Sequence, residues 1–310
     1  MDPTPSREMT GPGQYGKGMI LALVSYGLWG IFPVYFRVLA AAGVPDIEVV
    51  AHRIVWSFLM LGVFVSLVRR WGRILTTLRS PRSLLLLLLG AMLISTNWVF
   101  FVVAVSTQQL LQSSLGYFLG PMVAVMLGIV FLHERPRPWQ IVAIALALTG
   151  VAVFTRMIGQ FPTIAIILAC SFALYGLMKK LGGFDALTSL TVETMFLSAP
   201  AMICIVAVGR TPHGEMATIP FWLILALAGP VTVLPLFLWT AATRRLPLST
   251  VGMLQYIVPS AHFGLAVLDG EAFGMARLIS FIIIWIAVAI YVIDLVRNAR
   301  SAPQAQEIVE

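Results

Sequence analysis

The chain has 310 residues, of which 59% are hydrophobic and 11% are charged, and its formal net charge is +7. Soluble globular domains carry about 25% charged residues, and no soluble core could bury the apolar surface implied by a mean hydropathy of +0.95. The composition excludes an ordinary soluble domain and predicts a polytopic helical membrane protein. Cys170 and Cys204 stand alone inside apolar runs, which is typical of packing residues and indicates neither a metal site nor redox chemistry.

Ten apolar runs approach the length of about 20 residues that a membrane-spanning helix needs. They show no period-two alternation, which excludes a membrane β-barrel and predicts an all-α fold. The ten runs are 18–41, 48–68, 84–106, 110–132, 138–155, 162–178, 187–208, 220–243, 247–268 and 276–296. Outside them, residues 1–16 are rich in proline and glycine and are predicted to be disordered, and residues 297–310 form a polar tail.

The Lys and Arg residues indicate which side of the membrane each loop occupies, because cytoplasmic loops carry an excess of them. If the N-terminus is cytoplasmic, most basic loop residues fall on that side, including the pairs Arg69–Arg70 and Arg244–Arg245. We therefore expect a multi-pass inner-membrane protein with both termini in the cytoplasm. The bilayer and a small-molecule substrate are the expected partners, nucleic acid is not, and the sequence leaves a homodimer open.

The two halves of the chain resemble each other. Residues 113–134 are similar to residues 249–271, and SYGLWG at 25–30 is echoed by ALYGLM at 173–178. Each half contains five spans, so the second half, predicted at 157–296, must enter the membrane from the side opposite to the first, 17–156. Inverted repeats are typical of secondary transporters that bind substrate near the membrane midplane between the halves. The alternatives are a duplicated membrane scaffold and chance similarity between apolar helices.

Several stretches also resemble a known family almost continuously. They are SYGLWGIFPVYFRVL, EVVAHRIVWSF, SLGYFLGPMVAVMLGIVFLHERP, TSLTVETMFLSAPA and ATRRLPLSTVGMLQYIVP. The chain is similar over about residues 17–296 to the RarD branch of the EamA-type transporters, in the drug/metabolite transporter superfamily. The resemblance implies ten helices in two EamA repeats and secondary transport of a small solute. Departures from the family pattern fall at His133, Val258 and His262.

Two groups of charged residues lie inside the predicted spans. Glu193 is eight residues past Asp185, or about 12 Å along a helix, and an intramembrane carboxylate is a candidate for proton coupling or for binding a substrate amine. Its alternative is a protonated or hydrogen-bonded structural role. His52 and Arg53 lie near the outer end of their helix, where they either anchor it or line an outer vestibule that attracts anionic substrates.

The remaining polar and aromatic residues gather at equivalent places in the two halves. Small residues and interior prolines there allow close helix contacts and free carbonyl groups, and aromatic side chains offer apolar walls with polar tips. The predicted cavity lining is Asn97, Trp98, Ser114, Tyr117, Gln255, Tyr256 and Trp29. Taken singly, each of these residues is more typical of helix packing than of a binding site. Glu134 and Glu271 end two equivalent runs and are expected to cap helices or pair with loop arginines, with a gating pair as the alternative.

Together these features predict a secondary active transporter that exports a small polar or amphipathic metabolite by alternating access, with proton coupling as an option. A channel or facilitator without ion coupling is the nearest alternative, although the sequence shows no ring of charges or carbonyl filter. A membrane scaffold is a further one. An enzyme is not expected, because the chain has no HExxH, GxSxG or P-loop motif, and no cofactor is expected either.

Overall fold

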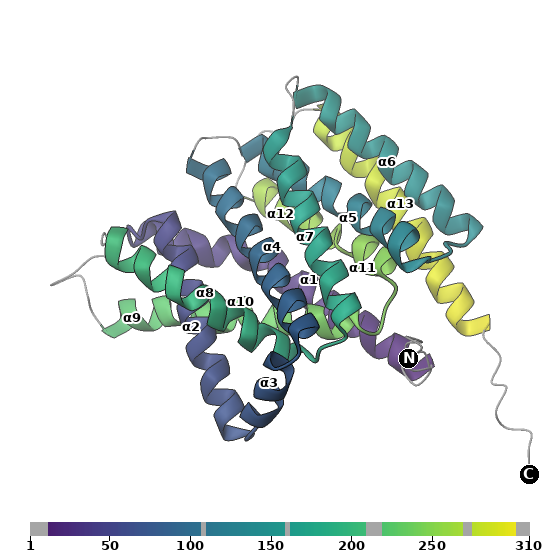
Figure 1. The fold of residues 1–310 in the computed structure, drawn as a ribbon. Coiled ribbons are helices and arrows are strands. Elements are labelled where there is room, and N and C mark those ends of the chain that lie inside the picture. The colour runs from purple at the N-terminus through teal and green to yellow at the C-terminus, as the bar shows by residue number, and fades with distance from the viewer. Residues whose placement is uncertain (1–11, 107–109, 159–161, 209–218, 269–274, 302–310) are drawn as a thin grey trace, which may run out of the picture.

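A computed structural model describes residues 12–106, 110–158, 162–208, 219–268 and 275–301, and all secondary-structure elements in these ranges are helices (Figure 1). They are α1 (Pro12–Ala41), α2 (Asp46–Leu67), α3 (Trp71–Leu78), α4 (Pro81–Ser106), α5 (Leu110–Leu132), α6 (Pro138–Ile158), α7 (Thr163–Gly182), α8 (Ala186–Val208), α9 (Ile219–Ala226), α10 (Ala228–Thr243), α11 (Leu248–Leu254), α12 (Ile257–Leu268) and α13 (Met275–Ser301).

Nine helical segments of the described chain are long and apolar enough to cross a membrane. The tenth predicted span, 247–268, is present as α11 and α12, which are separated by a turn at Gln255 and Tyr256. Proline causes this break, because its ring clashes with the carbonyl four residues earlier, and Pro259 stands four residues after Gln255. Pro230 has the same relation to Ala226, where α9 ends.

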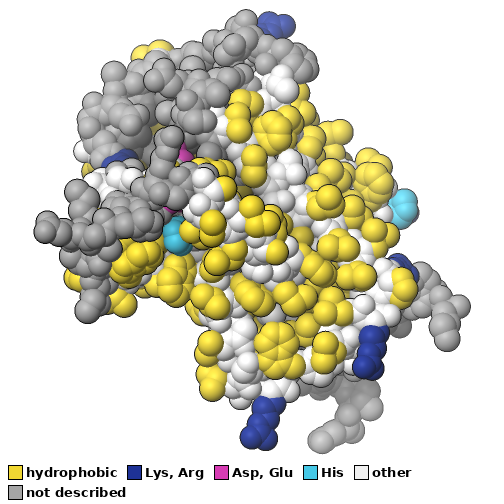
Figure 2. Space-filling model, turned by 60° about the vertical axis from the view of Figure 1, so that its left-hand side comes forward, with side chains coloured by type: hydrophobic (Ala, Val, Ile, Leu, Met, Phe, Trp, Pro, Cys, Tyr) yellow, Lys and Arg dark blue, Asp and Glu magenta, His cyan; other side chains and the backbone are white. Residues whose placement is uncertain are grey.

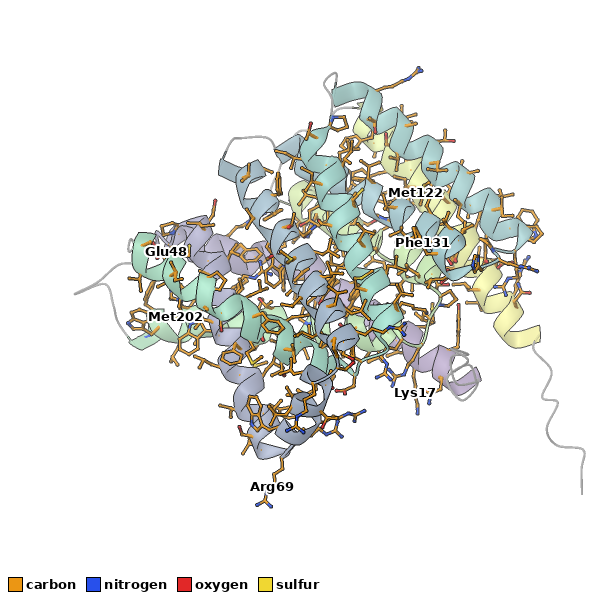
Figure 3. All side chains as sticks on the ribbon, viewed as in Figure 1. Lys17, Glu48, Arg69, Met122, Phe131 and Met202 are labelled. Atoms are coloured by element: carbon orange, nitrogen blue, oxygen red, sulfur yellow. The ribbon has the colours of Figure 1, made fainter. Side chains whose placement is uncertain are left out.

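The short helix α3 was not predicted from the sequence, which indicated only a basic loop between the second and third spans. Its apolar side buries Ile74, and the indole nitrogen of Trp71 donates to the Ser66 hydroxyl at 2.8 Å. In Figure 1 α3 lies at the lower edge of the molecule, on the side where α1 begins and α13 ends. We call this side the basic end; Lys17 and Arg69 mark it in Figure 3.

The contacts between helices are symmetric with respect to the two halves: when two helices pack together, their equivalents in the other half also do. Three contacts join equivalent helices of the two halves: α2 with α8, α5 with α11, and α6 with α13. The other major contacts come in matching pairs, since α5–α7 corresponds to α12–α1, α4–α7 to α10–α1, and α4–α8 to α10–α2. This is the arrangement expected of two five-helix repeats that face each other across a common centre.

Hydrophobic side chains cover the outside of this bundle. Figure 2 shows them over the middle of one face, with Lys and Arg side chains at its lower edge. Large apolar residues such as Leu67, Val206 and Ile203 expose more than two thirds of their surface. An apolar belt of this kind suits contact with lipid, where helices satisfy their backbone hydrogen bonds internally.

The connection between α10 and α11 at the basic end is fixed by two charged side chains. The Lys180 ammonium donates to the carbonyls of Thr243, at 3.1 Å, and of Leu246. The Glu134 carboxylate accepts the backbone N–H groups of Leu248 at 2.5 Å and Ser249 at 2.9 Å, at the start of α11. Glu134 therefore has the capping role that the sequence allowed, in the opposite half of the protein. Glu271, its counterpart, lies outside the described residues.

Candidate substrate cavity

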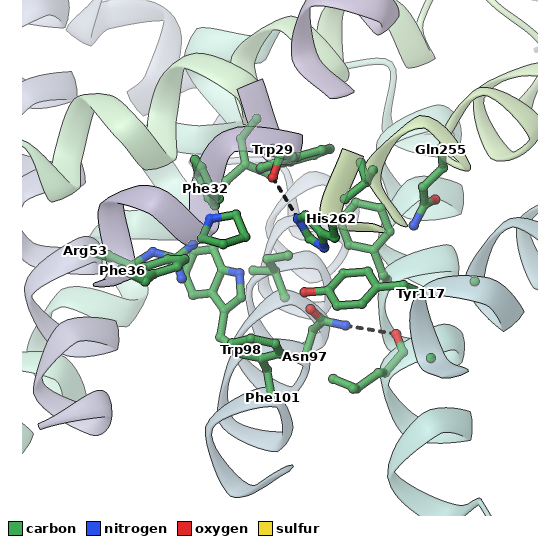
Figure 4. Close-up of a pocket in the computed structure, with 18 residues that line it drawn as sticks. Trp29, Phe32, Phe36, Arg53, Asn97, Trp98, Phe101, Tyr117, Gln255 and His262 are labelled. Atoms are coloured by element: carbon green, nitrogen blue, oxygen red, sulfur yellow. Dashed lines mark hydrogen bonds between the residues drawn. The ribbon is translucent and has the colours of Figure 1, made fainter. Parts of the chain in front are cut away.

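A cavity of about 140 Å³ lies between the two halves of the bundle (Figure 4). Helices α1, α2, α4 and α5 contribute to it from the first half, and α7, α10, α12 and the α11–α12 turn from the second. Its aromatic walls are Trp29, Phe32, Phe36, Trp98, Phe101 and Phe172. Its polar groups are Arg53, Asn97, Tyr117, Gln255 and His262. The turn between α11 and α12 places Gln255 in this lining, because it directs that side chain toward the cavity.

Arg53 is the one basic residue other than histidine in the described lining of the cavity. Its side chain is 8% exposed, and its Nε donates to the Thr232 hydroxyl of α10 at 2.9 Å. The guanidinium carbon lies 4.9 Å from the ring centre of Trp98, 5.3 Å from that of Phe36 and 5.7 Å from that of Phe32. These distances are within the range of about 6 Å for cation–π attraction. The cation is thus held in a fixed position by both halves of the bundle.

Backbone carbonyls position two of the other polar groups of the cavity, Asn97 and His262. The Asn97 amide nitrogen donates to the Leu168 carbonyl at 2.8 Å, and its remaining contact is the Ser171 hydroxyl at 3.1 Å. The His262 Nε2 lies 3.2 Å from the Trp29 carbonyl oxygen, and the rings of His262 and Tyr117 form a T-shaped pair with their centres 5.8 Å apart. In Figure 4 Asn97, Tyr117 and His262 point toward the centre, across from Arg53.

A layer of packed aromatic rings separates the cavity from the basic end. We call Tyr26, Phe172, Tyr175 and Trp239 the aromatic layer. Tyr175 and Trp239 stack with ring centres 5.6 Å apart and planes 4° apart, and Phe172 lies 5.0 Å from Trp239. The Trp239 indole donates to the Tyr26 hydroxyl at 3.1 Å, which in turn donates to the Val251 carbonyl at 2.7 Å. Tyr26, Tyr175 and Trp239 each lie one turn beyond a cavity residue on their own helix, so the layer closes the cavity on this side.

Glu193 lies beyond the aromatic layer, in a buried ion pair. Its carboxylate oxygens are 2.6 and 2.8 Å from the Lys179 ammonium, and the Tyr175 hydroxyl donates to it at 2.9 Å. Glu193 is 3% exposed and Lys179 is 4% exposed. Lys179 also donates to the Ser189 hydroxyl at 2.9 Å. Lys179 lies just outside the predicted span 162–178, on the side of the basic loops. In the structure it occupies the last turn of α7 and points into the bundle, where it neutralises Glu193.

The structure brings most of the predicted cavity residues together. Those that line the cavity are Trp29, Asn97, Trp98, Tyr117 and Gln255. Their part in binding a substrate stays a prediction. Arg53 joins them, whereas the sequence had left it either as an anchor of its helix or as part of an outer vestibule. Ser114 lies on α5, but its side chain is outside the described residues.

Three predicted site residues do not line the cavity. Tyr256 is 1% exposed and donates to the Phe118 carbonyl at 3.0 Å, because the turn that presents Gln255 directs the next residue into the core. His52 is buried and directly precedes Arg53 in the sequence. The side chains of consecutive helical residues point about 100° apart, so His52 faces away from the cavity that Arg53 lines. Glu193 is paired with Lys179 as described above.

Several aromatic residues and one histidine of the lining were not predicted from the sequence. Phe32 and Phe36 follow Trp29 at the three- and four-residue spacing of one helix face, a signal that was available in the sequence. His262 was noticed only as a departure from the family pattern. Phe101 and Phe172 had no local signal, because apolar helices contain many phenylalanines that contact lipid or core.

The comparisons with known proteins agree with this arrangement. Residues 16–156, which correspond to the predicted first repeat, match the model of the EamA-like transporter family. "Protein RarD" of Escherichia coli K12 is 41% identical to this chain over 290 residues, which cover 93% of this chain and 97% of that protein. This chain belongs to the RarD branch of the EamA-type transporters, in the drug/metabolite transporter superfamily.

Other relatives extend the comparison. An "uncharacterized transporter" of Vibrio cholerae serotype O1 is 42% identical over 293 residues, or 94% of this chain and 96% of that protein. The "chloramphenicol-sensitive protein RarD" of Pseudomonas aeruginosa is 32% identical over 295 residues, or 92% of this chain and 97% of that protein. A crystal structure of a protein that is 18% identical shares the fold, with a TM-score of 0.66 over 91% of this chain and 99% of the other. The chain is therefore a multi-pass membrane transporter of the EamA type.

Proposed function

We propose that this RarD-branch protein is a secondary active transporter of the inner membrane that exports a small polar or amphipathic metabolite by alternating access. In this proposal both termini lie in the cytoplasm, so the basic end faces the cytoplasm. The observation that carries it is the cavity: both halves of the bundle enclose it, and a packed aromatic layer closes it toward the basic end. Entry of substrate from that side requires the two halves to move relative to each other, which is the defining step of alternating access.

The same observation separates this function from its alternatives. A channel needs a continuous path, whereas Tyr175 and Trp239 are stacked and buried across the path in the described structure. A scaffold has no need for a fixed cation and several polar groups around a central cavity. Such groups are costly inside a membrane protein and usually mark a functional site. The cavity therefore favours transport over both.

A cavity-filling variant tests the proposal. A side-chain carbon added at Gly120 would lie 3.4 Å from the Gln255 amide nitrogen, so Gly120→Leu extends into the cavity. Gly264→Leu is the matched control, since an added carbon there meets nothing within 4 Å and the residue is exposed. We expect proteoliposomes with the wild type or Gly264→Leu to accumulate a substrate from a labelled metabolite panel above its external concentration. Gly120→Leu should abolish this; equal accumulation in both variants would exclude the cavity as the site.

Glu193 is the group that we propose for coupling transport to proton movement. It is buried next to the aromatic layer, and Tyr175 of that layer donates directly to it. Both carboxylate oxygens already contact Lys179, so a proton arriving at Glu193 would weaken the ion pair that holds α7 to α8. This geometry favours proton coupling over binding of a substrate amine, because the amine that Glu193 binds belongs to the protein itself.

The coupling is tested by removing both charges together. Glu193→Gln alone would leave Lys179 as a buried unpaired charge, so the informative variant combines Glu193→Gln with Lys179→Met. If Glu193 carries the proton, this double variant should still exchange substrate in counterflow but should no longer accumulate it in response to a pH gradient. Accumulation that follows the pH gradient as in the wild type would show that the proton moves elsewhere.

A further inference from the structure

We infer that the transported solute is a small organic monoanion with a flat apolar body, whose negative group binds the Arg53 guanidinium inside the cavity. This inference rests on the proposed transport function and adds the chemical class of the substrate. It follows from three features of the cavity: an uncompensated cation, the geometry that holds it, and the size and chemistry of the remaining walls.

The charge balance of the cavity is the first feature. Arg53 is 8% exposed, and no carboxylate of the described residues lies within ion-pair distance of its guanidinium. The described lining contains neither Asp nor Glu. A buried cation in a membrane protein is costly unless a counter-charge accompanies it. Lys179 has such a partner in Glu193. For Arg53 the missing negative charge has to come from the ligand.

The geometry around Arg53 is the second feature. Thr232 accepts from Nε and the rings of Phe36 and Trp98 lie over the guanidinium, so these contacts fix the plane of the group. The two terminal nitrogens carry the remaining donors, and the described residues accept no hydrogen bond from them. A planar fork of donors matches a carboxylate, which it can bind through two parallel hydrogen bonds. Arg53 is thus pre-positioned for an oxyanion that enters from the cavity.

The size and chemistry of the other walls are the third feature. The cavity volume of about 140 Å³ is close to that of the roughly 150 Å³ cavity that holds benzene in an engineered protein. A single ring therefore fits between the aromatic walls. Across from Arg53, Asn97, Tyr117 and His262 can bond a neutral polar substituent. An amine would find no carboxylate in the described lining, and the faces of Phe36 and Trp98 are already occupied by Arg53.

Three probes of nearly equal shape separate the effect of charge from that of size: benzoate, benzamide and benzylamine, which are negative, neutral and positive at pH 7. Their binding is measured by isothermal titration calorimetry on the full-length protein in nanodiscs. We expect wild type to bind benzoate about tenfold to a hundredfold more tightly than benzamide, the range for hydrogen bonds to a charged group. Benzylamine should bind no more tightly than benzamide.

Variants of two arginines assign the preference to one residue. Arg53→Gln should reduce the benzoate preference to about onefold, and Arg53→Lys, which keeps the charge without the planar fork, should retain part of it. Arg156→Gln is the matched control, because Arg156 is an exposed cation at the end of α6, outside the cavity. It should leave the preference intact. Thermal unfolding of each variant shows whether Arg53→Gln remains folded, and Arg53→Lys carries the test if it does not.

The outcomes distinguish this inference from the proposed function. Equal binding of the three probes, no binding of any, or a benzoate preference that survives Arg53→Gln would each overturn the anion assignment. If Gly120→Leu still abolished accumulation of a neutral or cationic metabolite, transport through the cavity would stand and only the substrate class would fall. If Gly120→Leu left accumulation unchanged, the proposed site of transport would fall, whatever the probes showed.

Discussion

The basic end and the cavity both contain charged side chains inside the bundle, but these side chains differ in whether they have partners within the protein. At the basic end Lys179 and Glu193 form an ion pair, and Lys180 and Glu134 bond backbone groups of the α10–α11 connection. In the cavity the Arg53 guanidinium contacts aromatic rings and donates to one hydroxyl, and no carboxylate of the described residues pairs with it. The contrast indicates that charges at the basic end hold the structure together, whereas the charge in the cavity is available to a ligand.

This difference follows from what each region must do in a transporter. Groups that close one side need partners within the protein, so that the closed state is stable in the absence of substrate. A binding group needs an unsatisfied interaction, because only then does substrate gain free energy on entering. Binding then shifts the equilibrium between states only as far as the substrate prefers one of them. Substitutions that remove these charges therefore test the contrast.

The largest effect is expected at the buried ion pair. Glu193→Gln should lower the free energy of unfolding by about 3–5 kcal/mol, because it leaves the Lys179 charge buried without a counter-charge. Adding Lys179→Met should restore most of that loss, since the double variant buries no charge. Unfolding in mixed micelles with increasing SDS is measured for Glu193→Gln, Lys179→Met and the double variant. Additive losses in the double variant would show that the two residues do not stabilise each other.

The sequence was sufficient to predict most of the fold. Runs of apolar residues gave the spans, and the similarity of residues 113–134 to residues 249–271 indicated the repeat. The breaks were not predicted, although Pro230 and Pro259 were visible, because a proline inside a spanning helix can either kink it or end it. Helix α3 was missed because its eight residues are too few to span and were interpreted as loop.

The cavity was only partly predictable. Asn97, Tyr117 and Gln255 stood out as polar residues in apolar helices, which is a local signal. The sequence could not show that Lys179 reaches Glu193, because fourteen positions and a helix–helix turn separate them. A lysine near the end of a span is most simply assigned to a loop, and only the packing of α7 against α8 reveals its partner. Assigning Arg53 to the cavity similarly required knowing that α1 and α10 surround it.

A smaller effect is expected at the cap of α11. Glu134→Gln should lower the free energy of unfolding by about 1–2 kcal/mol, because a neutral amide oxygen replaces a charged acceptor for the two N–H groups of Leu248 and Ser249. The same SDS titration measures the loss. Lys17→Gln is a suitable control, since Lys17 carries an exposed charge at the same end. The two substitutions change the net charge in opposite directions, so an equal loss in both variants would show that the effect is not specific to the cap.

Replacing Asp185, which precedes α8, should lower the free energy of unfolding by an amount that depends on pH. It accepts hydrogen bonds from the Thr188 backbone at 3.1 Å and the Thr188 hydroxyl at 2.8 Å, and Arg73 lies 3.5 Å away. Partial burial acts to raise the pKa of Asp185, but the bonds from Thr188 and the charges of Arg73 and Arg70 outweigh it, so the pKa lies below its ordinary value. At neutral pH, Asp185→Ala should cost about 1 kcal/mol, the typical value of an N-cap.

The sign of the pH dependence follows from that lowered pKa. The stabilisation by Asp185 is fully present above the unfolded pKa of about 3.9 and is lost as the pH falls through the folded value. The difference in melting temperature between wild type and Asp185→Ala should therefore shrink as the pH is lowered from 6 toward 3. A difference that stayed constant over this range would mean that the charge of Asp185 does not contribute.

The smallest effect on the unliganded protein is expected at Arg53. Arg53→Gln removes cation–π contacts with three rings and the bond to Thr232, but it also removes a buried charge that has no described counter-charge. The lost contacts are worth roughly 0.5–2 kcal/mol for each ring, and an arginine inside a spanning helix costs up to about 2.5–3.5 kcal/mol, the value at the helix centre. The two terms nearly cancel, so the melting temperature should change by only a few degrees. Losses as large as those of Glu193→Gln would place Arg53 with the structural charges and remove the contrast between cavity and basic end.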